Sequence, residues 1–281
     1  MAVDRFSFLR GGTVLSGLRG GGGGDLIVLL HGLAGSAAEM VPLGEALGMR
    51  FVALDQRGHG FSARRPSDLS RQAFVDDVVA LLGDEPAWLV GQSMGAHTAM
   101  LVAAEKPVRG LVMISGGVGG STDDYPKALG EYFASWPVPF ADEEAARGFL
   151  GDRPIAEAWV VGFERRPDGL YPRFDADVME AVMRPVADAA RWDAWERITA
   201  PTLLIRGADD DFDPVEAERM AGRAKTETAE RMAGRAKTET AERMAGRAKT
   251  ETATIAGAGH DVHLEKRDRT AQLIRRFIGG C

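Results

Sequence analysis

A serine set between two glycines is the strongest chemical signal in this chain. Residues 91–95 read Gly-Gln-Ser-Met-Gly, with an apolar run at 87–90 before them and a helix-like stretch at 96–104 after them. A Gly-x-Ser-x-Gly turn between a strand and a helix holds its serine in a strained conformation with the hydroxyl exposed. Glycine is required at both flanks because a side chain there would collide with the neighbouring strand or helix. Ser93 is therefore predicted to be a nucleophile.

A serine hydroxyl attacks effectively only when an imidazole takes its proton and a carboxylate orients that imidazole. The chain offers five histidines, at positions 31, 59, 97, 260 and 263. Four aspartates crowd one late loop: Asp209, Asp210, Asp211 and Asp213. Asp213 precedes Pro214, with Glu216 three residues later, which is typical of a helix N-cap. The other three aspartates remain candidates for the orienting acid.

The elements that must position these residues alternate between strands and helices. Ser36 and Glu39 form a capping-box pattern that predicts the start of a helix. A hairpin is expected at 5–9 and 13–18, strands at 26–30, 51–54, 87–90, 110–114, 201–205 and 253–256, and helices at 72–82, 96–104 and about 264–278. Strands separated by helices predict an α/β fold with a mostly parallel sheet and helices on both faces.

More than eighty residues separate the strand that ends near Ser115 from the one that begins at Thr202, too many for a simple crossover. We expect residues 1–115 and 191–281 to form the core and residues 116–190 to form a helical cap over the carboxyl edge of the sheet. The segment is rich in aromatic residues, most of which should hold the cap together. Three are predicted to face a substrate pocket: Trp136, Phe140 and Trp159.

Residues 218–253 contain three identical copies of a twelve-residue unit. Identical copies indicate a recent tandem duplication or deliberate engineering. The unit is too short and too polar to predict a solenoid. Two arrangements remain open: the extra copies protrude as a helical arm, or they loop out while one copy takes the native place. A protruding arm is a candidate surface for self-association, and an inert insertion is the alternative.

Four further motifs stand in a specific order around the serine. They are His-Gly-Leu at 31–33, Asp-Gln-Arg-Gly-His-Gly-Phe-Ser at 55–62, Gly-Ala-Asp-Asp at 207–210 and Gly-Ala-Gly-His at 257–260. With the Gly-x-Ser-x-Gly turn, they make the chain resemble an α/β-hydrolase, a serine esterase-like member with a helical lid between strands six and seven. The resemblance covers nearly the whole length, and the order Ser, Asp, His is that of the fold.

The resemblance implies roles for individual residues. By the family's spacing, Asp210 is the acid and His260 is the base of a triad with Ser93. The backbone N–H groups of Leu33 and Met94 form the implied oxyanion hole. Among the other histidines, we expect His31 and His59 in backbone-shaping loops, His97 on the helix behind the nucleophile, and His263 at a helix start or on the surface.

The nucleophile's identity narrows the reaction. A serine that attacked an alkyl carbon would leave an ether that water cannot cleave, so acyl transfer is indicated. We expect hydrolysis of carboxylic esters, or of related lactones or thioesters, through an acyl-enzyme intermediate, on small apolar ester-type substrates. Two alternatives are a non-catalytic or slow-turnover receptor on the same fold and an acyl hydrolase with perhydrolase activity. No cofactor or metal is expected.

Composition fits this interpretation. The chain has 281 residues, of which 45% are hydrophobic and 27% charged, and its formal net charge is −7. No block of like charges appears, which argues against nucleic acid or an anionic membrane as the main partner. The only cysteine, Cys281, excludes an internal disulfide. No signal-like or membrane-spanning run is visible, and a cytoplasmic location is expected.

Overall fold

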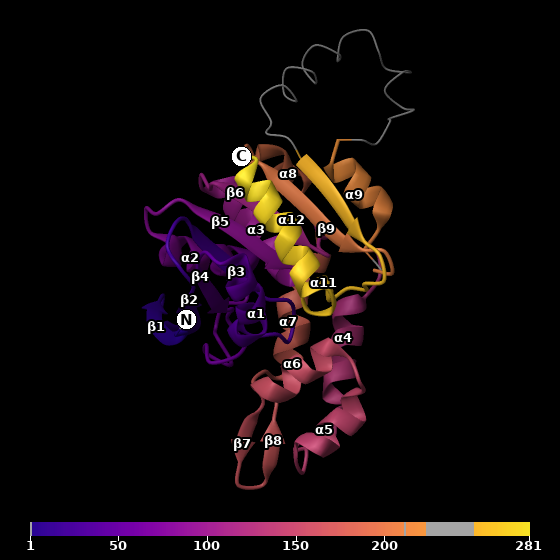
Figure 1. The fold of residues 1–281 in the computed structure, drawn as a ribbon. Helices are drawn as coiled ribbons and strands as arrows, with labels where there is room; N and C mark the ends of the chain where they lie inside the picture. The colour runs from indigo at the N-terminus through magenta and orange to yellow at the C-terminus, as the bar shows by residue number, and fades with distance from the viewer. Residues whose placement is uncertain (1, 211, 223–249) are drawn as a thin grey trace.

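The computed structural model describes residues 2–210, 212–222 and 250–281, which form a central sheet covered by helices on both faces (Figure 1). The sheet has the strand order β1-β2-β4-β3-β5-β6-β9-β10. β1 and β2 pair antiparallel, as do β2 and β4, and the other neighbours pair parallel. Its strands are β1 Asp4–Arg10, β2 Thr13–Gly20, β3 Leu26–Leu30, β4 Arg50–Asp55, β5 Ala87–Gln92, β6 Gly110–Ile114, β9 Thr202–Gly207 and β10 Thr250–Ile255. The mostly parallel α/β fold expected from the sequence is confirmed.

Alternate residues of the buried strands feed two separate cores. In β3, Leu26, Val28 and Leu30 join one cluster, and Ile27 and Leu29 join the other. The first cluster lies under α2 (Arg71–Leu82), α3 (Met94–Glu105) and α8 (Trp192–Arg197), and the second under α1 (Ala37–Leu47) and α12 (Arg267–Gly279). A continuous apolar strand is what burial on both faces requires.

Residues 121–187, which we call the cap, lie between β6 and β9 at one end of the sheet (Figure 1). Two backbone hydrogen bonds close the neck of this insert, from Gly120 N to Val186 O (2.8 Å) and from Ser121 N to Ala187 O (2.9 Å). The cap contains α4 Tyr125–Ala134, α5 Glu143–Leu150, α6 Pro154–Gly162, β7 Glu164–Arg166, β8 Gly169–Tyr171 and α7 Ala176–Ala187. The β7–β8 hairpin was not expected, although Pro167-Asp168-Gly169 at its tip is a turn signal.

Two local expectations are wrong. Ser36 is the N-cap of α1, but its side chain makes no capping hydrogen bond, and the Glu39 carboxylate turns inward to His263 instead of closing a capping box. The single final helix is two helices, α11 (Val262–Glu265) and α12, because Lys266 leaves helical geometry at φ −134°. Asp213 does cap α9 (Pro214–Met220), accepting a hydrogen bond from Val215 N.

The repeats are described only at their two ends. The first copy begins inside α9, and the third copy ends inside β10. The rest, and with it the question of a protruding or looped-out insert and of self-association, lies outside the described residues. Among the helices that the structure describes, none is long and apolar enough to cross a membrane.

Candidate active site

Ser93 occupies a strained turn between β5 and α3. Its φ is +50° and its ψ is −115°, a backbone conformation that a non-glycine residue rarely adopts. A Cβ atom added at Gly91 would lie 2.2 Å from the carbonyl oxygen of Gly95, and one added at Gly95 would lie 2.2 Å from that of Leu30. The predicted need for both glycines is confirmed, and such strain at a reactive residue is typical of functional sites.

His260 and Asp210 form a hydrogen-bonded pair. The His260 Nδ1 lies 3.0 Å from the Asp210 Oδ1, which also accepts a hydrogen bond from Phe212 N at 3.1 Å. The Asp210 side chain is fully buried, whereas that of His260 is 46% exposed. With the Nδ1 proton donated to the carboxylate, Nε2 carries the lone pair that a general base needs.

The environment of Asp210 keeps its carboxyl group ionised. Burial acts to raise its pKa, but the hydrogen bond from His260 and the neighbouring Ser115 hydroxyl outweigh burial, so the pKa of Asp210 lies below its ordinary value. An ionised carboxylate stabilises the imidazolium that forms when the base takes a proton. Ser115, at the end of β6 and itself at φ +49°, is a site residue that the sequence did not reveal.

Gln92 connects the loop that carries His260 to the turn that carries Ser93. Its Nε2 donates to the carbonyl oxygen of His260 at 3.3 Å, and Ser93 follows it directly in the chain. A Cβ at Gly32 would lie 2.0 Å from the Gln92 Oε1, so the glycine of the His-Gly-Leu motif makes room for this amide. The role of Gln92 was missed because the variable positions of Gly-x-Ser-x-Gly carry no signal of their own.

The groups of the expected oxyanion hole stand beside the serine. Met94 is the first residue of α3, and the first N–H groups of a helix have no intrahelical acceptor. Gly32 precedes Leu33, and a Cβ at Gly32 would lie 3.5 Å from the Ser93 Cβ. The assignment of the Leu33 and Met94 N–H groups to an oxyanion remains a prediction.

Buried polar groups hold the loops around the site. The Nε2 of His31 accepts a hydrogen bond from Gln56 N at 3.0 Å, and the Nδ1 of His59 lies 3.0 Å from the carbonyl oxygen of Arg57. Asp55 accepts from Ala37 N at 2.7 Å and from Phe61 N at 3.1 Å. The loop-shaping roles expected for His31 and His59 are confirmed.

His263 lies at a helix start, which is one of its two expected places, and not on the surface. It lies in the short helix α11, but its side chain is fully buried and its Nε2 lies 2.8 Å from the Glu39 Oε1. Glu39 is 224 residues away in sequence, so no local pattern could have disclosed the pair.

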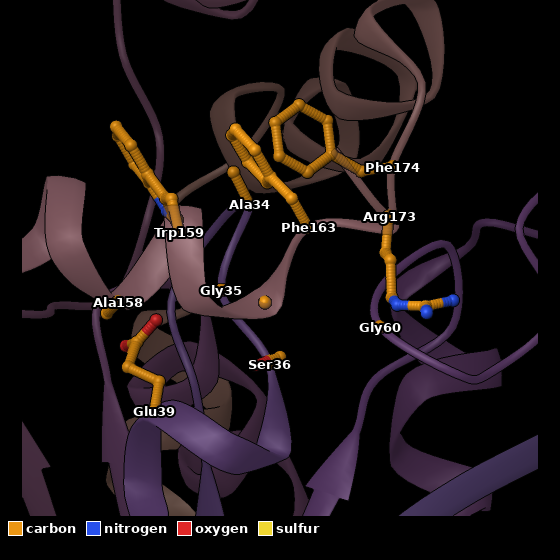
Figure 2. A pocket seen from close by; sticks show the side chains of 11 residues that line it. Ala34, Gly35, Ser36, Glu39, Gly60, Ala158, Trp159, Phe163, Arg173 and Phe174 are labelled. Carbon is orange, nitrogen blue, oxygen red and sulfur yellow. The ribbon is translucent and has the colours of Figure 1, made fainter. Parts of the chain in front are cut away.

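A pocket opens between the cap and the core, beside residues 34–36, which follow the His-Gly-Leu motif. Figure 2 shows Trp159, Phe163 and Phe174 on the cap side, and Ser36 and Glu39 on the core side. Its other lining residues are Ala34, Gly35, Gly60, Ala158, Gly162 and Arg173. Trp159 thus borders a pocket, whereas Trp136 and Phe140 pack inside the aromatic cluster of the cap. A substrate-binding role for these three residues remains a prediction.

Of the remaining candidates, Asp209 is exposed and Asp211 lies outside the described residues. Within the described part of the chain, no group of three or more His, Cys, Asp or Glu side chains is arranged to hold a metal ion.

Comparison with known proteins agrees with this geometry. A profile of the alpha/beta hydrolase family matches residues 27–273. A 2-(acetamidomethylene)succinate hydrolase of Mesorhizobium japonicum is 30% identical over 213 residues, which cover 70% of this chain and 75% of that protein. The esterase YbfF of Escherichia coli is 26% identical over 277 residues, covering 90% and 92%.

A solved structure shares the whole architecture. The crystal structure of an E-2-(acetamidomethylene)succinate hydrolase superposes with a TM-score of 0.80 at 22% identity, covering 99% of this chain and 100% of that chain. The chain therefore belongs to the alpha/beta hydrolase family and has its fold. Its relatives support hydrolase activity.

Proposed function

We propose that the protein is a serine hydrolase that cleaves carboxylic esters, or related lactones and thioesters, through an acyl-enzyme intermediate. The observation that carries the proposal is the 3.0 Å pair of His260 and buried Asp210, on a loop tied through Gln92 to the strained Ser93. A histidine that is hydrogen-bonded to a buried carboxylate can activate a serine hydroxyl. The strained turn at Ser93 has an explanation if this serine is the nucleophile. The Escherichia coli relative is named an esterase, which supports the same bond type.

In the proposed reaction, the acyl group passes first to Ser93 and then to water. The Ser93 oxygen attacks the acyl carbonyl carbon while His260 Nε2 takes the hydroxyl proton, and the carbonyl oxygen becomes an oxyanion that accepts hydrogen bonds from the Leu33 and Met94 N–H groups. His260 then gives its proton to the departing alcohol or thiol. Water, deprotonated by the same imidazole, attacks the acyl-serine and releases the acid, which restores the Ser93 hydroxyl.

Hydrolysis of p-nitrophenyl esters of increasing acyl length, together with lactones, tests this proposal. We expect turnover by the parent chain, none above background by Ser93→Ala, and a mass increase of one acyl group on the peptide that carries Ser93 after rapid quenching. Binding of esters without turnover or acylation would refute the hydrolase proposal and favour the receptor alternative.

A further inference from the structure

Arg71 is a buried cation for which the described residues supply no acidic partner. It begins α2 and is 4% exposed. Its Nη2 donates to the Thr98 hydroxyl and, at 3.5 Å, to the carbonyl oxygen of Met94. Its Nε and Nη1 have no hydrogen-bond partner among the described residues, and no carboxylate in that part of the chain lies within ion-pair distance. The guanidinium sits over the ring of Phe74, 4.5 Å from its centroid.

A second buried arginine, Arg57, has both a carboxylate partner and a hydrogen bond from each of its guanidinium nitrogens. Arg57 is 2% exposed, and its Nε and Nη2 donate to the two carboxylate oxygens of Asp77 at 2.7 and 2.6 Å. Its Nη1 donates to the carbonyl oxygen of Asp68 at 2.6 Å. Burying a charge is unfavourable unless a counter-charge and hydrogen bonds compensate for lost hydration. Arg71 lacks the compensation that Arg57 has.

Further polar groups surround Arg71 where the core meets the cap. Burial, followed by the charge of Arg191, lowers the pKa of Arg71 to about 9, while Tyr125 acts in the opposite direction. Burial, followed by the charges of Arg71 and Arg191, lowers the pKa of His97. Electrostatic interactions thus link Arg71, Arg191, His97 and Tyr125, which we call the Arg71 cluster. The carboxylate of Asp188 acts on Tyr125 but is not among the groups that perturb Arg71.

The cluster lies against the first turn of the nucleophile's helix. Met94, whose carbonyl accepts from Arg71, follows Ser93 directly. The loop after β6 runs over the same turn: a Cβ at Gly116 would lie 2.9 Å from the carbonyl oxygen of Ser93, and one at Gly119 would lie 3.1 Å from the His97 Nε2. Arg71 therefore contacts the first turn of the helix that begins directly after Ser93.

We propose that Arg71 binds a carboxylate on the acyl part of the substrate, so that the preferred substrates are half-esters or related acyl compounds of dicarboxylic acids. The inference rests on the proposed function, because the anion is placed beside the acylated serine. A guanidinium donates charge-assisted hydrogen bonds to a carboxylate, and the donors of Arg71 left without a partner in the described part of the chain are Nε and Nη1. The substrate's carboxylate supplies a counter-charge that the described residues do not provide for Arg71.

A matched pair of substrates tests the proposal. Monomethyl succinate and methyl butyrate have acyl chains of the same length and differ in a terminal carboxylate or methyl group. We expect the parent chain to favour the acid in kcat/KM, and Arg71→Met to lower the ratio of acid to neutral rates by on the order of 10- to 100-fold, the usual contribution of a hydrogen bond to a charged group. Arg71→Lys should restore part of the ratio, and Arg184→Met, at a partly exposed cap arginine paired with Asp124, should leave it unchanged.

A binding measurement separates this proposal from the previous one. Succinate should raise the melting temperature of Ser93→Ala and have no such effect on Ser93→Ala with Arg71→Met, a double variant whose own unfolding transition shows that it folds. Equal rates for the two esters, with no change in Arg71→Met and no succinate effect, would overturn the anion site while leaving the serine mechanism intact. Absence of all ester turnover would overturn the proposed function, and the succinate shift would then still decide the anion site.

Discussion

Two histidines three residues apart, His260 and His263, each lie against a carboxylate, at 3.0 and 2.8 Å. The His260 side chain is 46% exposed, whereas the side chains of His263 and its partner Glu39 are buried, at 0% and 2% exposed. A histidine–carboxylate pair is therefore not by itself a catalytic device. The first pair is distinguished by its exposed imidazole and by the hydrogen bond from Gln92, the residue before Ser93, to the His260 carbonyl oxygen. The second pair joins α1 to α11.

The largest effect should follow from removing Ser93, the proposed nucleophile, or His260, the proposed base. Ser93→Ala and His260→Ala should each lower ester turnover by on the order of 10⁴-fold or more, because no other group takes or gives the proton. Both side chains are at least partly exposed, so the melting temperature should change little. Initial rates with p-nitrophenyl butyrate and thermal unfolding measure the two quantities. Wild-type turnover by either variant would remove the distinction between the two histidines.

The acid of the exposed pair should matter nearly as much. Asp210→Asn should lower kcat by about 10⁴-fold, because an amide in place of the carboxylate favours the wrong imidazole tautomer. Asp209→Asn, one residue away and exposed, is the matched control and should remain close to the parent. A crippled Asp209→Asn with an active Asp210→Asn would contradict the assignment of the acid.

Disruption of the buried pair, Glu39 and His263, should lower stability and not turnover. Glu39→Met leaves His263 buried without its acceptor, and we expect the free energy of unfolding to fall by roughly 1.5–3 kcal/mol, as for a buried hydrogen bond with a charged group. Asp268→Asn, at a carboxylate whose side chain is 83% exposed, is the control. Urea denaturation and kcat per folded molecule are the measurements. A loss of activity like that of Asp210→Asn without any loss of stability would make Glu39 a catalytic acid and end the comparison.

The other buried histidines should make the stability of the protein fall in acid. Burial lowers the pKa of His59 from 6.5 to about 3 and lowers those of His31 and His97 as well. The unfolded chain binds these protons below pH 6.5 and the folded chain does not. The free energy of unfolding should therefore fall as the pH drops from 6.5 towards 3, by at most about 1.4 kcal/mol per pH unit for each histidine. Urea denaturation at pH 7.5, 6.0 and 5.0 measures the slope, and a flat profile would contradict the neutral state of these imidazoles.

The smallest effect should come from shortening the repeats. Deletion of residues 230–253 leaves one twelve-residue copy and places His260 26 positions after Asp210. The remaining copy still supplies the α9 residues 218–220 and the β10 residues 250–253, since the copies are identical. We expect a folded hydrolase with activity within about tenfold of the parent, because loop closure depends only weakly on length. An inactive or insoluble product would show that all three copies are integral to the fold.

Prediction from the sequence succeeded where the signal was local. The strands at 26–30 and 110–114 match the structure at both ends because both faces are buried and the apolar run is continuous. Asp213 was identified as an N-cap because its partner, Val215 N, is two residues away. The strained serine turn with its two glycines was recognised for the same reason.

Prediction failed where a partner is distant in the chain. Ser36 and Glu39 have the spacing of a capping box, but His263 provides Glu39 with a buried partner and α1 forgoes the cap. Arg71 was passed over because a helix-starting arginine looks like an ordinary surface residue. Its burial depends on Met94, Thr98 and Phe74, which are brought around it only when α2 packs on α3.

The closed neck of the cap has a consequence for how this protein can change. Because Gly120 and Ser121 bond directly to Val186 and Ala187, the insert leaves and re-enters the core at almost one point. A segment of different length or shape whose ends are equally close can be exchanged there without displacing β6 or β9. The carboxylate and the imidazole of the exposed pair come from beyond the insert, on loops after β9 and β10. Exchange of this one insert would therefore leave Asp210 and His260 in place.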